Sequence, residues 1–227
     1  MNFVKLPVRA LTVAAVLMAA GVSANALTIN TAGMVANSVQ AFSQDALDQF
    51  ELFDITVAPL GNATALAQPG AFNLPITSIT TNSKLKVTAG ASVGSALAIT
   101  RNLPSGKAYT ITLANFSLDY VNHKVLADTT VTQPDVANVT QAQAAVYNFS
   151  TATPLALKYK FPLTITGHEV LDKLFLTEEA QQIMYTGLKL PSIALTVLPT
   201  TDFGTLTQDI KVAFRKAVST KPYVPAP

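Results

Sequence analysis

Lys107-Ala-Tyr-Thr-Ile-Thr-Leu113 carries Tyr, Ile and Leu at every second position, with a threonine between each pair. That spacing gives a strand one apolar and one polar face, which is typical of an antiparallel sheet with one side in the core and the other in water. The stretches 159–166, 193–197 and 210–215 alternate in the same way. We therefore expect a strand at each of these places.

Turn-forming sequences such as Gly61-Asn62, Pro69-Gly70 and Gln133-Pro-Asp135 recur between the alternating stretches. Many short strands separated by such turns are typical of a β-sandwich or a barrel. We predict a mainly β fold, an antiparallel β-sandwich or flattened barrel with two short helices at about 43–53 and 177–186. An outer-membrane barrel is an alternative, but aromatic residues make up only 7% of the chain and such barrels carry two aromatic girdles.

Both expected helices begin at a residue whose side chain can cap a helix. Ser43 precedes the first and Thr177 the second, and acidic residues follow each within the first turn. A capping hydroxyl accepts a hydrogen bond from a backbone N–H that has no partner within the helix, and the acids suit the positive end of the helix dipole. A Thr-Val-containing apolar segment follows each helix. The segments 43–59 and 177–199 are thus either a duplicated helix–strand unit or two instances of a common pattern.

The amino terminus has the three parts of a secretory signal peptide. Lys5 and Arg9 make its start positive, residues 10–22 are almost all apolar, and Ala-Asn-Ala at 24–26 fits the small-x-small cleavage pattern. The apolar run is shorter than the ~20 residues that a spanning helix needs. We expect cleavage after residue 26, a bacterial protein that is secreted, periplasmic or at the cell surface, and no membrane span in the mature chain.

The remaining chain has the size of one domain. We expect 27–220 to form a single β-rich domain and 221–227, which is rich in proline, to form an extended carboxyl-terminal tail. With 49% hydrophobic and 12% charged residues the chain is not disordered, and without cysteine it has no disulfide, thiolate metal site or cysteine nucleophile. Loss of Lys5 and Arg9 from the 15 basic residues leaves 13, equal to the 13 acidic ones, so we expect no nucleic-acid partner.

Gly90-Ala-Ser92-Val-Gly94 matches the G-x-S-x-G pattern that presents the nucleophile in many serine hydrolases. A triad would also need a carboxylate and an imidazole, for which Asp128 or Asp135 and His168 are the candidates. The segment before the pattern is amphipathic rather than continuously apolar, and no clear helix follows it. The pattern therefore favours a glycine-lined turn, and a serine hydrolase using Ser92 is kept as an alternative.

The chain has 2 histidines, and each lies in a sequence that suggests a ligand. His168-Glu-Val-Leu-Asp172 resembles a zinc-binding spacing without a third ligand nearby, so we predict no metal site. Tyr120 and His123 are candidate cofactor-binding residues, because tyrosine is an axial ligand of haem iron and a neighbouring imidazole can hold the phenolate. The simpler interpretation is that Tyr120 ends a hairpin strand and His123 lies in its loop.

No pair of carboxylates stands out for acid–base chemistry, so we predict no enzyme activity and no catalytic residue. The segments 55–83 and 136–157 carry no charge, although exposed strand edges usually do. These segments are either buried or face a partner. We predict first a structural, adhesive or matrix component that associates with itself or with other surface proteins through strand edges. The alternative is a carrier of a small apolar or haem-like ligand, and we expect no other cofactor.

Overall fold

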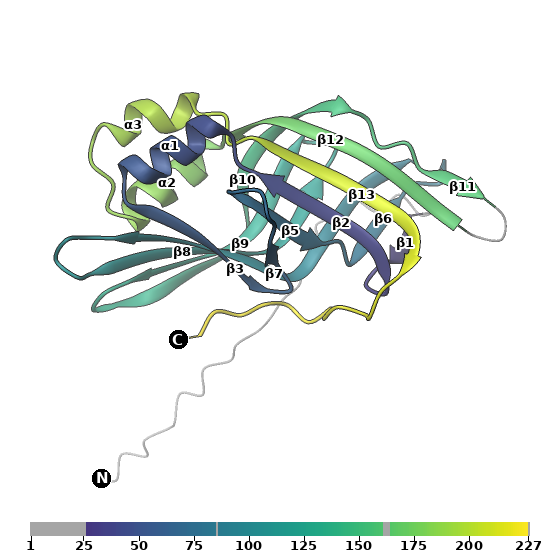
Figure 1. Ribbon diagram of the computed structural model, residues 1–227, viewed down its shortest axis with the longest axis horizontal. Coiled ribbons are helices and arrows are strands. Elements are labelled where there is room, and N and C mark those ends of the chain that lie inside the picture. Colours follow the sequence, from purple (N-terminus) through teal and green to yellow (C-terminus); the bar gives the residue numbers. More distant parts are fainter. Residues whose placement is uncertain (1–25, 85, 161–163, 227) are drawn as a thin grey trace, which may run out of the picture.

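The computed structural model describes residues 26–84, 86–160 and 164–226. In this part of the chain the strands form one 13-stranded antiparallel sheet. The sheet curls into a half-barrel, and short helices gather at one end of it (Figure 1). The predicted mainly antiparallel β fold is confirmed, and the single curled sheet corresponds to a flattened, open barrel. The expected signal peptide, 1–26, lies outside the described residues except for Ala26.

The strands differ greatly in length. Their bounds are β1 Leu27–Asn30, β2 Met34–Ala41, β3 Ile55–Gly61, β4 Thr64–Ala65, β5 Ala71–Pro75, β6 Ser78–Thr81, β7 Val87–Asn102, β8 Ala108–Asp119, β9 Lys124–Gln133, β10 Val136–Thr153, β11 Lys158–Lys160, β12 Thr164–Leu176 and β13 Thr205–Phe214. Along the sheet they follow the order β1-β6-β7-β8-β9-β10-β12-β13-β2-β5-β4, while β3 pairs with β7 and β11 with β12. The long strands β7 to β10 form one wall of the half-barrel, and β13 and β2 belong to the facing wall.

A row of bulges bends the wall formed by β7, β8, β9 and β10. The pairing register shifts at neighbouring points of successive strands, and the bulged positions are occupied by Gly94, Asn115 and Gln143. All three residues have positive φ, at 80°, 53° and 48°. Because a bulge increases the local twist and bends its strand, aligned bulges make the sheet curl.

The described residues form three α-helices, two of which begin at the expected capping residues. They are α1 Gln44–Leu52, α2 Glu178–Gly187 and α3 Ala194–Val197, and a 3-10 turn continues α3 over Leu198–Thr200. The hydroxyls of Ser43 and Thr177 accept hydrogen bonds of 3.1 Å from backbone N–H groups three residues on, as predicted. Among the described residues, none of the helices has the length and hydropathy that crossing a membrane requires.

An aromatic cluster closes the end of the half-barrel beneath the helices. The ring of Phe42 contacts those of Phe50 and Phe72 at centroid distances of 5.1 and 6.1 Å, and Phe203 contacts both Phe50 and Tyr147. Each of these five rings is buried.

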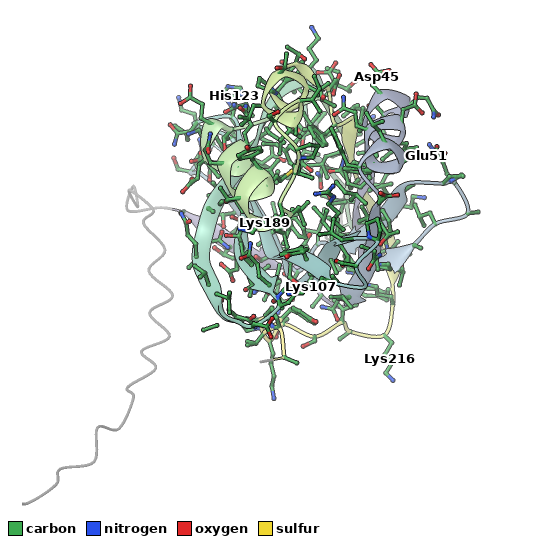
Figure 2. The ribbon with its side chains drawn as sticks, turned by 90° about the vertical axis from the view of Figure 1, so that its left-hand side faces the viewer. Asp45, Glu51, Lys107, His123, Lys189 and Lys216 are labelled. Atoms are coloured by element: carbon green, nitrogen blue, oxygen red, sulfur yellow. The ribbon has the colours of Figure 1, made fainter. Side chains whose placement is uncertain are left out.

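Figure 2 shows labelled charged side chains such as Asp45 and Lys216 at the outside of the molecule. The hydrophobic core therefore extends from the helices into the interior of the curled sheet.

The expected strand at 193–197 is wrong, because this segment forms α3. Ala194 and Leu198, four residues apart, are buried, whereas Ile193 and Leu195 are exposed. Four of the five residues in 193–197 are apolar, so the segment fits a helical period as well as an alternating one. In the suspected duplication 55–59 corresponds to 195–199, but 55–59 lies in strand β3 whereas 195–199 lies in α3 and the 3-10 turn, so the two helix–strand units are not equivalent.

The stretch 159–166 is not one strand either. Lys158–Lys160 forms β11, which pairs antiparallel with Thr164–Thr166 at the start of β12, and 161–163 lie outside the described residues. Pro162 is the sequence signal against a continuous strand, since proline cannot donate to the ladder. The strands expected at 107–113 and 210–215 are confirmed as parts of β8 and β13, although β13 ends at Phe214.

Candidate functional site

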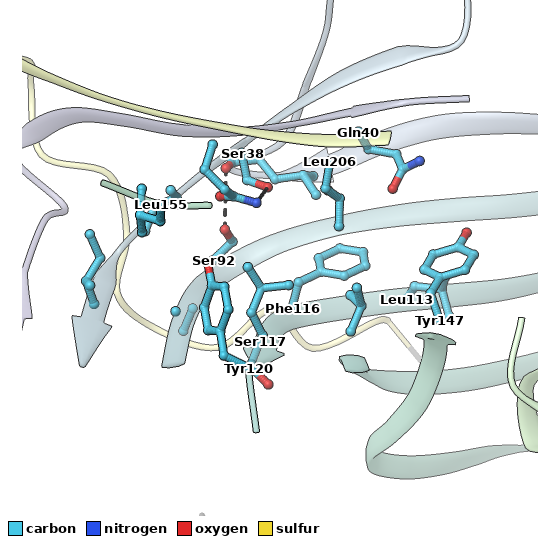
Figure 3. A pocket seen from close by; sticks show the side chains of 18 of the residues that line it. Ser38, Gln40, Ser92, Leu113, Phe116, Ser117, Tyr120, Tyr147, Leu155 and Leu206 are labelled. Atoms are coloured by element: carbon cyan, nitrogen blue, oxygen red, sulfur yellow. Dashed lines mark hydrogen bonds between the residues drawn. The ribbon is translucent and has the colours of Figure 1, made fainter. Parts of the chain in front are cut away.

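A cavity lies inside the half-barrel, between β2 and β13 on one side and β7, β8 and β10 on the other (Figure 3). Its volume is about 40 Å³. One ordered water needs about 10–15 Å³, so the space is large enough for several waters. Most lining side chains are aliphatic or aromatic, and none of the described residues that line it is charged.

The wall formed by β2 and β13 carries polar side chains on its inner face. Ser38 and Gln40 are two residues apart on β2 and therefore point to the same side, and Gln208 lies opposite Ser38 on β13. Gln208 Nε2 donates to Ser38 Oγ at 2.9 Å, and Gln40 Nε2 donates to the carbonyl oxygen of Phe203 at 3.2 Å. All three polar side chains are buried. This wall therefore offers hydrogen-bonding groups to an otherwise apolar space.

The facing wall carries aromatic rings among its aliphatic side chains, and one of these rings has a hydroxyl without a partner among the described residues. Phe116 comes from β8 and Tyr147 from β10, and both rings are buried. No hydrogen bond to another described residue involves the Tyr147 hydroxyl. Burial raises the pKa of Tyr147, so the group stays protonated and can donate.

At the far end of the cavity, Tyr120 is joined to a buried carboxylate. Its hydroxyl donates to Glu169 Oε2 at 2.5 Å, while Glu169 Oε1 accepts from the backbone N–H of Leu155 at 3.2 Å. Burial raises the pKa of Glu169, and the two hydrogen bonds oppose part of that rise. Burial and the nearby Glu169 both raise the pKa of Tyr120. Tyr120 is thus held as a protonated donor.

The structure brings Tyr120 and His123 to the same aromatic side chain without pairing them with each other. Tyr120 lies just after β8 and His123 has a φ of 53° in the turn before β9. Their rings contact Phe149 at centroid distances of 6.1 and 5.5 Å. His123 is exposed, whereas Tyr120 reaches the cavity and bonds to Glu169. Cofactor binding by these two residues stays a prediction.

The candidate hydrolase residues have separate partners. Ser92 lies within β7, is buried, lines the cavity and donates to the carbonyl oxygen of Leu74 at 3.4 Å. Asp128 accepts from Asn115 and from Gln143. These contacts place Ser92 in a strand rather than on a strand-to-helix turn, and they do not assemble a triad.

His168 and Asp135 complete the set of candidate side chains. His168 lies on β12, where its Nδ1 is 2.9 Å from Asp209 Oδ1, and both side chains are largely exposed. Asp135 lies in the turn between β9 and β10 and forms an exposed ion pair of 3.5 Å with Lys107. Neither residue lines the cavity.

A second, smaller cavity of about 20 Å³ lies between the sheet and α2. Its lining is almost entirely apolar and includes Ile111, Val146 and Met184. Tyr147 lines both cavities, so its ring forms part of the boundary between them.

Sequence reasoning missed Gln40, Tyr147, Glu169 and Gln208. Their only signal is a polar or hydroxyl-bearing residue at an inward position of an alternating strand, as at Ser38 and Gln40. That signal cannot be read without knowing which face of the strand is buried. The contacts that matter also join residues far apart in the chain, such as Gln40 and Phe203.

Comparison with solved structures shows a related fold. The C-terminal domain of HtaA from Corynebacterium glutamicum has a TM-score of 0.52 and 11% sequence identity, covering 79% of this chain and 98% of that domain. A domain-swapped dimer of a histidine-to-alanine variant of the same domain has a TM-score of 0.45 and 12% identity, covering 77% of this chain and 97% of the other. At this identity the likeness concerns the fold alone. No protein-family model matches the chain, and no curated protein matches it.

Proposed function

We propose that this chain is an exported, non-enzymatic binding protein that holds a small apolar ligand inside its curled sheet. The observation that carries the proposal is the cavity of about 40 Å³ with its mostly aliphatic and aromatic lining. Protein interiors are close-packed and contain few voids larger than a water molecule. Binding of an apolar ligand in such a cavity is favourable, because the ligand replaces water or empty space with van der Waals contacts.

The same geometry supports a ligand that the protein does not chemically transform and that contains no iron. Ser92 has no imidazole or carboxylate partner among the described residues. The Tyr120 hydroxyl donates to Glu169, and binding iron as a phenolate would require it to give up that proton. Export is supported by the signal-peptide pattern at 1–26.

Toluene is a suitable apolar probe, and because benzene-sized molecules fill cavities of about 150 Å³, its binding requires this cavity to expand. We expect saturable binding by isothermal titration calorimetry and a rise in the unfolding temperature with toluene concentration. Ser92→Leu places a larger apolar side chain on the cavity wall and should abolish binding. Ala98→Leu is the matched control, since Ala98 lies on the same strand but outside the lining, and it should bind as the unmodified protein does. Absence of toluene binding, or equal binding by both variants, would contradict the proposal.

A second candidate function, association through a strand edge, is favoured by the first half of β10. Residues 136–143 are all exposed and uncharged, and they pair with β9 on one side, whereas β12 pairs only with Tyr147–Thr153. An unpaired, uncharged edge is a template for another strand. Concentration-dependent light scattering should decrease in Val139→Lys and stay unchanged in Val121→Lys, an exposed position in a turn. A protein that is monomeric at all concentrations and binds no strand would contradict this function.

A further inference from the structure

One part of the cavity, here called the polar corner, is lined by the Tyr147 hydroxyl and the Gln40 amide oxygen, and no described side chain pairs with either group. Tyr147 is only 5% exposed, yet no hydrogen bond between described residues involves its hydroxyl. Buried hydroxyl groups are usually paired, so an unpaired one that faces a cavity is available to a ligand or a water. The hydroxyl can donate one hydrogen bond and accept others.

Gln40 supplies the complementary group. Its Nε2 donates to the carbonyl oxygen of Phe203, which fixes the orientation of the amide because that carbonyl can only accept. The amide oxygen then faces away from Phe203, and no described donor reaches it. Gln40 is 3% exposed, so little of this side chain is open to bulk water.

Tyr147 and Gln40 meet at a common neighbour. The ring of Tyr147 contacts that of Phe203 at 5.7 Å, and Gln40 binds the backbone of the same residue. Figure 3 shows the Tyr147 hydroxyl directed toward the wall on which Gln40 lies, across the cavity. One donor and one acceptor thus face the same part of an otherwise apolar space.

The geometry points to a neutral ligand with an apolar body and one hydroxyl, which accepts from Tyr147 and donates to Gln40. This inference rests on the proposed function and adds the chemical class of the ligand. A hydroxyl fits because it is both donor and acceptor, whereas a purely apolar group would leave both protein groups unpaired. A carboxylate does not fit, since none of the described lining residues is a cation and an unpaired buried anion is strongly disfavoured.

Toluene, phenol and benzoate test this class, because toluene and phenol have nearly the same shape and differ by a methyl or a hydroxyl group. A cavity without polar partners prefers toluene, which is the more hydrophobic of the two. We expect phenol to bind about tenfold more tightly than toluene by calorimetry, and benzoate not to bind. Tyr147→Phe should bring phenol to the affinity of toluene or below and leave toluene binding unweakened. Tyr109→Phe, outside the cavity lining, is the control and should keep the preference.

The outcomes separate this inference from the proposed function. If toluene binds as tightly as phenol, the cavity is an apolar site whose polar corner keeps its water, and the inference is wrong while the proposed function stands. A phenol preference that survives in Tyr147→Phe, or tight binding of benzoate, also overturns it. If neither toluene nor phenol binds, both the inference and the proposed function fail.

Discussion

The Tyr120 hydroxyl and the Glu169 carboxylate are joined by a hydrogen bond of 2.5 Å at the end of the cavity. Glu169 is only 1% exposed, and its second oxygen accepts from the backbone of Leu155. Tyr120 and Leu155 both line the cavity, so the hydrogen bonds to Glu169 connect two segments of the cavity wall. Among the described residues no cation forms an ion pair with Glu169, and hydrogen bonds alone hold it.

Replacing Glu169 by glutamine should remove part of the pH dependence of stability. Burial raises the pKa of Glu169 in the folded protein. The folded state therefore binds this proton more tightly than the unfolded state does. The resulting stabilisation is complete below the unfolded pKa and is lost as the pH rises through the folded pKa. Urea unfolding between the ordinary glutamate pKa and neutral pH should show a free energy that falls with pH more steeply in the unmodified protein than in Glu169→Gln.

Glu51→Gln is the control for this experiment, because Glu51 is an exposed carboxylate on α1. It should leave the pH dependence of the unfolding free energy as it is in the unmodified protein. Parallel curves for the unmodified protein and Glu169→Gln would show that Glu169 has the same pKa in both states.

The two glycines of the Gly90-x-Ser92-x-Gly94 pattern should differ in their tolerance of alanine. Gly94 has a φ of 80°, and a Cβ there would lie 2.6 Å from Asn62 Nδ2 and 3.0 Å from the carbonyl oxygen of Lys221. At Gly90 the nearest heavy atom to a Cβ would be 4.0 Å away. We expect Gly94→Ala to lower the free energy of unfolding by about 2–4 kcal/mol and Gly90→Ala to change it by less than ~1 kcal/mol.

Denaturant titrations of the two alanine variants side by side measure this difference. If both variants are equally destabilised, position 90 does not tolerate a Cβ either. The expected asymmetry would instead assign the pattern to the bulge of β7 rather than to a nucleophile turn.

Local sequence patterns predicted the elements whose contacts are local or whose apolar face is simple. The strand at 107–113 alternates cleanly, and the caps Ser43 and Thr177 act on N–H groups three residues away. The segment 193–197 was ambiguous because nearly every residue in it is apolar, so only tertiary packing decides between strand and helix.

The cavity could not be predicted because it depends on how the sheet curls. The row of bulges at Gly94, Asn115 and Gln143 bends four strands together, and only one of the three is a glycine. Asparagine tolerates the left-handed region better than most residues, but nothing local marks Gln143. Gln40 and Tyr147 belong to separate strands, and only the curl of the sheet brings their inward-facing side chains to the same cavity.

Asn115 should control the docking of the carboxyl-terminal tail. Its side chain accepts from the Tyr223 N–H at 2.8 Å and donates to the Tyr223 carbonyl at 3.0 Å, as a neighbouring strand would. Asn115→Gly keeps the positive φ accessible but removes both bonds. We expect it to raise the hydrogen exchange rate of the Tyr223 amide by at least about tenfold, which corresponds to roughly 1.4 kcal/mol. Asn102→Gly, at the exposed end of β7, should leave that rate unchanged. Equal exchange in all three proteins would show that other contacts hold the tail.

Arg215 should contribute more to stability than its partly exposed position suggests. Its guanidinium donates to the carbonyl oxygens of Ala32 and Ile76, both at 3.2 Å, and to Asn37 Oδ1 at 2.8 Å. The planar fork reaches these acceptors from three different nitrogens, whereas a lysine presents all its donors from one ammonium nitrogen. We therefore expect Arg215→Lys to lower the free energy of unfolding by roughly 2 kcal/mol even though the charge is kept. Lys216→Met, at the exposed neighbouring residue, should change it by less than about 0.5 kcal/mol. If Arg215→Lys proves as stable as the unmodified protein, charge rather than the forked geometry holds this end of β13 against β2.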